Sequence, residues 1–86
     1  PVTPSPSRGA ASVSFDLPRA GRVRLDLHDV RGRLVRTLVD TPRAAGTHVA
    51  RWDGRDAAGT PVAAGVYFLR IEAAGETRSG RIALLR

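Results

Sequence analysis

The chain contains no cysteine, methionine, lysine, asparagine or glutamine among its 86 residues. The lack of cysteine excludes disulfides and thiolate metal sites. No run approaches the ~20 consecutive apolar residues that a membrane-spanning helix requires. A domain of this length buries only about 60–65% of its unfolded surface, so it has little room for an enclosed active site. These absences favour a small, non-catalytic domain without a membrane span.

Every basic residue is an arginine, and fourteen arginines against eight acidic residues give a net charge of +6. With abundant alanine and glycine, this usage is typical of a GC-rich coding sequence; attraction to acidic partners is the functional alternative. A nucleic-acid surface would rest on Arg22, Arg24 and Arg36, which share a predicted solvent face. Asp26 interrupts that stripe and no aromatic residue lies within it, so nucleic-acid binding is not expected.

The first nine residues are rich in proline and serine and show no hydrophobic periodicity. They predict a linker or an association arm carrying Val2, Pro4 and Pro6, because prolines lack the donors that a central strand needs. The domain proper is predicted at residues 10–86. Since the chain starts at Pro1 and has no methionine, we expect an excised domain or a processed mature protein.

Apolar and polar residues alternate in the segments after residue 10, which is the period of half-buried strands. The inward-facing positions of the first two segments are Val13, Phe15, Leu17, Val23, Leu25 and Leu27. The turn at residues 18–21 predicts that these two strands form a hairpin. Residues 34–39 predict a strand of ambiguous facing, with a bulge or a helix as alternatives, and residues 40–46 predict a loop.

The second half of the chain continues the pattern. Residues 47–52 place His48, Ala50 and Trp52 on one face, and a further strand faces inward with Tyr67, Leu69 and Ile71. Residues 74–76 predict a hairpin turn before a last strand with Ile82 and Leu84. Six or seven short strands separated by turns and no amphipathic helix predict an all-β fold, an immunoglobulin-like antiparallel β-sandwich of about seven strands.

The most informative segment is Trp52-Asp53-Gly54-Arg55-Asp56, followed by Gly59 and Gly65-Val66-Tyr67. Aspartate accepts local backbone hydrogen bonds and glycine supplies positive φ, so two consecutive turns are predicted here. A calcium loop would need more oxygen ligands than these aspartates provide. The predicted core and turn residues are Phe15, Trp52, Asp53, Gly54, Asp56, Gly59, Gly65 and Tyr67.

No arrangement of residues indicates catalysis or a cofactor. His28 and His48 lack a second ligand at metal-site spacing, and the serines lack a histidine partner suited to a triad. The aromatics Phe15, Trp52 and Tyr67 are needed for the core rather than for a sugar-binding platform. We therefore predict that the chain is not an enzyme and binds no metal or cofactor.

These residues together resemble the immunoglobulin-like domain of the flagellar hook-capping protein family and the type A sorting domains of type IX secretion. The resemblance runs through nearly the whole chain: Pro4-Ser5-Pro6, residues 13–18, residues 23–36, Trp52-Asp53-Gly54-Arg55-Asp56, Gly59, residues 65–68 and the basic end at Arg86. Such sorting modules commonly open with Pro-Asn-Pro and an aromatic residue, where this chain has Pro4-Ser5-Pro6-Ser7.

The resemblance implies a non-catalytic accessory domain of an exported bacterial protein, acting in secretion sorting, surface attachment or domain spacing. Its expected partners are upstream domains of a parent protein or the secretion machinery, and its expected location is extracellular or at the cell surface. The alternative is a structural subunit that forms a homo-oligomer or an extracellular fibre. In that case edge strands would pair, or the arm would dock on a neighbour.

Overall fold

The structure is a computed structural model that describes residues 2–7, by their backbone, and residues 9–85. Pro1, Arg8 and Arg86, which belong to the predicted N-terminal segment and basic end, lie outside the described residues. The described part forms seven strands in two antiparallel sheets, the immunoglobulin-like sandwich that the sequence predicts. It contains no helix of the length and apolar character that crossing a bilayer requires.

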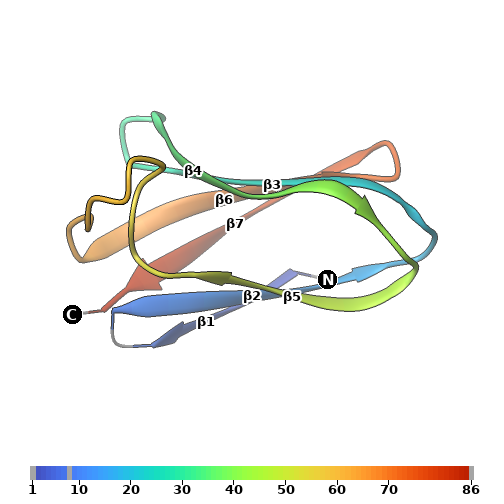
Figure 1. Cartoon of the computed structure of the whole chain (residues 1–86), viewed down its shortest axis with the longest axis horizontal. Helices are drawn as coiled ribbons and strands as arrows, with labels where there is room; N and C mark the ends of the chain where they lie inside the picture. The colour runs from blue at the N-terminus through green and yellow to red at the C-terminus, as the bar shows by residue number, and fades with distance from the viewer. Residues whose placement is uncertain (1, 8, 86) are drawn as a thin grey trace.

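The two sheets face each other as two layers (Figure 1). The three-stranded sheet has the order β1 (Val2–Ser7), β2 (Ala10–Leu17), β5 (Gly46–Trp52). The four-stranded sheet has the order β4 (Leu34–Arg43), β3 (Gly21–His28), β6 (Gly65–Ala73), β7 (Glu76–Leu84). One end, on the right in Figure 1, carries the β2–β3 and β4–β5 connections and the β6–β7 hairpin; we call it the crossover end.

Alternating residues from both sheets fill the space between the layers, because successive side chains of a strand point to opposite faces. The core therefore takes its side chains from strands far apart in the sequence. Its buried apolar members are Ala11, Val13, Phe15, Leu17, Val23, Leu25, Leu27, Val39, Ala50, Trp52, Tyr67, Leu69, Ile71, Ile82 and Leu84.

The predicted hairpin between residues 10–17 and residues 21–28 is wrong. β2 pairs with β1 and β5, whereas β3 pairs with β4 and β6, so the chain changes sheets between Leu17 and Gly21. Alternation of apolar and polar residues shows which face of a strand is buried. It does not show whether the next strand pairs in the same sheet or lies in the opposite layer, because both strands bury one face in either case. The predicted β6–β7 hairpin is present, with Ala73 opposite Glu76 across a two-residue turn.

The segment predicted as a loop at residues 40–46 is largely strand. β4 continues to Arg43, which lies opposite Gly21, and only Ala44 and Ala45 connect it to β5. Proline at position 42 is compatible with this because β4 has a neighbour on one side only. The ambiguous facing of residues 34–39 arises from register shifts in the β3–β4 pairing, so the bulge alternative is confirmed and the helix alternative is wrong.

The N-terminal segment also differs from the predicted linker or arm. The backbone of Val2–Ser7 pairs with β2, from Val2 opposite Phe15 to Ser7 opposite Ala10. The boundary predicted after residue 9 therefore falls in the β1–β2 turn. Pro4 and Pro6 disfavour a central strand, and β1 is an edge strand, where missing donors are tolerated.

Candidate functional site

The predicted turn residues lie in the loop between β5 and β6, where the two aspartates organise backbone amides. Asp53 Oδ1 accepts the Arg55 N–H at 3.1 Å. Asp56 Oδ1 accepts the N–H groups of Ala58 and Thr60, both at 3.0 Å. Gly54 and Gly59 have φ values of 74° and 85°, which favour glycine. Both carboxylates thus act in consecutive turns.

This loop is also fastened to β4 and to the core. Arg36 donates to the Asp53 carboxylate, and the Ala57 N–H donates to the Val35 carbonyl at 3.2 Å. The Trp52 indole N–H donates to the Arg55 carbonyl at 2.8 Å. Through these bonds the loop connects β5 of one sheet to β4 of the other.

We expect calcium or a chelator to leave the melting temperature within about 1 °C, because Asp53 and Asp56 are engaged by amides and by Arg36. Within the described residues, no three His, Asp or Glu side chains come close enough to hold a metal ion. Differential scanning calorimetry with calcium and with EDTA is the measurement. A calcium-dependent rise of several degrees that disappears in Asp53→Ala would contradict this expectation.

Tyr67 lies near the start of β6, and its hydroxyl donates to the carbonyl of Ala63 four residues upstream. This contact resembles the tyrosine corner of immunoglobulin-like sandwiches, in which a tyrosine ties a strand to the preceding loop. Gly65, with φ of 149°, lies between the two partners. Sequence reasoning placed Tyr67 in the core but missed this bond; the Gly-Val-Tyr start of the strand was the available signal.

We expect Tyr67→Phe to lower the free energy of unfolding by about 1 kcal/mol, because it removes one hydrogen bond to a backbone carbonyl and keeps the buried ring. Urea denaturation followed by the circular dichroism of the sheets gives the value. Phe68→Leu, on the outward face of the same strand, is the matched control. Equal midpoints for Tyr67→Phe and wild type would show that the hydroxyl does not stabilise the fold.

The arginine stripe considered for nucleic acid is neutralised by carboxylates. Arg22 pairs with Asp40 at 2.8 Å and Arg24 pairs with Asp26 at 2.9 Å, while Arg36 pairs with Asp53. The exposed Arg22–Asp40 pair stabilises the fold little. Asp26 is buried and also accepts a hydrogen bond from the Thr37 hydroxyl. The three pairs compensate positive charge that phosphate contacts would use. The three arginines of the predicted stripe are therefore engaged by carboxylates of the same chain.

The β3–β4 turn is organised by a single carboxylate. Asp29 accepts the N–H groups of Arg33 and Arg31 and also pairs with the Arg33 guanidinium at 3.2 Å. These bonds, the Arg33 amide first, hold the pKa of Asp29 below its usual value because they favour the charged carboxylate. The Asp29 carboxylate is therefore charged at neutral pH and accepts both amide hydrogen bonds of the turn.

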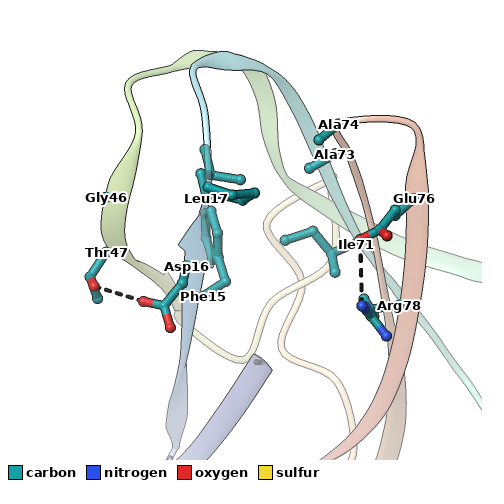
Figure 2. Close-up of a pocket in the computed structure, with 11 residues that line it drawn as sticks. Phe15, Asp16, Leu17, Gly46, Thr47, Ile71, Ala73, Ala74, Glu76 and Arg78 are labelled. Carbon is teal, nitrogen blue, oxygen red and sulfur yellow. Dashed lines mark hydrogen bonds and ion pairs between the residues drawn. The ribbon is translucent and has the colours of Figure 1, made fainter.

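A groove of about 600 Å³ at the crossover end is the candidate binding site of the domain (Figure 2). Phe15, Leu17 and Ile71 form its apolar part, and two polar pairs border it. Thr47 donates to Asp16 at 2.7 Å, and Arg78 approaches Glu76 at 3.4 Å. The further lining residues are Pro18, Gly46, Ala73 and Ala74.

The groove combines an apolar part with polar side chains that pair with one another. The described lining residues include no histidine, serine or tyrosine that would act as base or nucleophile, and both carboxylates are engaged. Among the predicted core and turn residues, Phe15 lines the groove. Trp52, Tyr67 and the residues of the β5–β6 loop lie elsewhere. The lining comes from β2, β5, β6 and β7, so no local sequence motif would have revealed it.

Comparisons with known proteins agree with this fold. The family model described as "FlgD Ig-like domain" matches residues 3–77. FlgD from P. aeruginosa is 24% identical over 91% of this chain and 64% of its own, with a TM-score of 0.68. FlgD from Xanthomonas campestris, reported for its hook capping in flagellar assembly, is 30% identical over 91% of this chain and 59% of its own, with a TM-score of 0.68.

A third solved structure is PorZ from Porphyromonas gingivalis, described as an essential surface component of the type-IX secretion system. It is 21% identical over 99% of this chain, with a TM-score of 0.67, and the match covers 11% of PorZ. No curated protein sequence matches the chain significantly. The chain thus spans less than two thirds of each of these three solved proteins.

Proposed function

The chain belongs to the FlgD Ig-like domain family, and from this premise we propose that it is a non-catalytic accessory domain of an exported bacterial protein. In this role it acts in secretion sorting, surface attachment or domain spacing. Its partners are upstream domains of a parent protein or components of the secretion machinery. Its place of action is outside the cell or at the cell surface.

The observation that supports this proposal most is that known structures contain the same sandwich as one part of a longer chain. The matched region makes up 64% and 59% of two FlgD proteins and 11% of PorZ. The candidate groove, with its apolar part and engaged carboxylates, suits contact with another polypeptide better than catalysis. Both features support a function through attachment.

The test is a fusion of the domain to the C-terminus of a periplasmic reporter enzyme in a bacterium that has type IX secretion. The proposal expects reporter activity at the cell surface or in the medium. A second fusion with a Gly/Ser segment of equal length controls for length, and one carrying Trp52→Ala controls for folding. Equal export of the domain and Gly/Ser fusions contradicts sorting and attachment and leaves spacing as the role.

The alternative is a self-assembling fibre subunit, and its arm-docking form has less support because β1 pairs with β2 of its own chain. A segment used in its own sheet is not available as an arm for a neighbour. The accessory-domain proposal expects a monomer in solution, whereas the fibre alternative expects large assemblies. Light scattering during size-exclusion chromatography distinguishes the two.

A further inference from the structure

Along one side of the sandwich, the edge strands of the two sheets, β4 and β5, border a common cavity. Each has a strand neighbour on one side only within the described residues, β3 for β4 and β2 for β5. The cavity between them has a volume of about 350 Å³, and we call it the β4–β5 seam. Its lining residues are Phe15, Leu38, Val39, Arg43, His48, Val49, Ala50 and Arg51.

The seam is cationic, since Arg43 and Arg51 line it and none of the described lining residues is acidic. Six other arginines form ion pairs with carboxylates. Within the described residues, Arg43 and Arg51 have no such partner. The nearest carboxylate along β4, Asp40, is already held by Arg22. The seam is therefore bordered by two arginines that have no carboxylate partner in the described residues.

His48 fixes one wall of the seam. Its ring lies against Phe15, opposite it in the β2–β5 register, with the ring centres 5.5 Å apart and an interplanar angle of 28°. Its Nε2 lies 2.7 Å from the Ala44 carbonyl and must donate there, because a carbonyl oxygen only accepts. The wall next to the two arginines is therefore held in place before any ligand arrives.

The backbone edges decide which kind of anion fits best. An edge strand offers N–H and C=O groups that an extended peptide can pair with, giving affinity through the main chain and specificity through alternate side chains. A polysaccharide sulfate or a free phosphate would use the arginines and leave those backbone groups unmatched. The net charge of +6 would also increase the rate at which an acidic partner arrives.

We propose that the β4–β5 seam binds an extended, acidic segment of a partner protein, which pairs with the edge of β5 and presents carboxylates to Arg43 and Arg51. This inference rests on the proposed function in that it names a partner for an attachment domain. Its test uses isolated components, so it can fail while the export test of the fusion succeeds.

The experiment measures binding of a fluorescent, end-blocked peptide of alternating glutamate and valine by anisotropy. The double variant Arg43→Gln/Arg51→Gln should weaken binding about tenfold, the factor that two exposed charge contacts supply. Arg31→Gln/Arg81→Gln is the matched control, because it removes the same charge from arginines outside the seam and without an ion pair in the described residues. Unchanged melting temperatures in both variants establish that the fold is kept.

Two further probes test strand pairing. The same peptide with alternate backbone amides methylated should lose most of its affinity, and amide hydrogen exchange should slow in β5 when the unmodified peptide binds. Equal weakening in both double variants would overturn the proposal in favour of non-specific charge attraction. Binding of inorganic polyphosphate as tight as that of the peptide, without added protection of β5, would overturn it in favour of a simple anion site.

Discussion

Replacing Trp52 with alanine is expected to lower the free energy of unfolding by about 3–5 kcal/mol, most of the stability of a domain this small. Trp52 is 1% exposed at the end of β5. Its ring meets that of Tyr67 edge to face, with the centres 5.0 Å apart and an interplanar angle of 73°. Removing the indole leaves a cavity where the two layers and the β5–β6 loop meet.

Urea denaturation, followed by circular dichroism because the variant lacks the fluorophore, provides the measurement. Trp52→Phe is the informative control, since it keeps an aromatic ring against Tyr67 and loses the hydrogen bond to the Arg55 carbonyl. Trp52→Phe should lower the free energy of unfolding by less than Trp52→Ala. An unchanged midpoint for Trp52→Ala would show that Trp52 is not an anchor of the core.

Deletion of residues 1–7 is expected to destabilise the domain by several kcal/mol rather than to leave a stable core without its arm. The deletion removes β1, which pairs with β2 along its whole length, and uncovers the edge of the three-stranded sheet. Losses of this size approach the total stability of small domains. Thermal denaturation of the shortened protein is the measurement, and full retention of the melting temperature would return residues 1–7 to the role of a free arm.

Point substitutions test the same strand with less disruption. The backbone groups of alternate residues in a strand face opposite edges, and Pro4 and Pro6 share one edge. Because proline lacks the N–H donor, we infer that this edge faces away from β2 and that Ser5 bonds to β2 opposite Ser12. Ser5→Pro should therefore cost about 1–3 kcal/mol, whereas Pro4→Ala should leave stability nearly unchanged. Equal effects of the two would contradict the pairing.

Much of the fold was predictable because burial in a sandwich repeats every second residue. The alternation at residues 13–17, 23–27 and 67–71 identified inward faces that the structure buries. The hairpin at Ala74 and Gly75 was predictable because its signal is local. Such features depend only on residues that are close in the sequence, so the local pattern predicts them.

Features that depend on which strands meet were not predictable. The chain passes from one sheet to the other between β2 and β3, although the alternation in these strands is equally compatible with a hairpin. The β4–β5 seam and the groove at the crossover end combine residues from strands that are distant in the sequence. No local sequence motif therefore identifies either of them. The proline and serine content of residues 1–9 indicates a linker or an arm. Edge strands also tolerate proline, so composition alone does not distinguish an edge strand from a linker.

The arrangement of the first and last strands has a mechanical consequence for a domain that joins other parts of a protein. Val2 lies opposite Phe15 toward the crossover end, while Leu84 lies opposite Gly65 at the other end. Tension between the chain ends therefore acts along β1 and β7 and loads their ladders in shear. Many hydrogen bonds must then yield together instead of one after another, so the sandwich resists pulling along the direction in which an attached chain would transmit force.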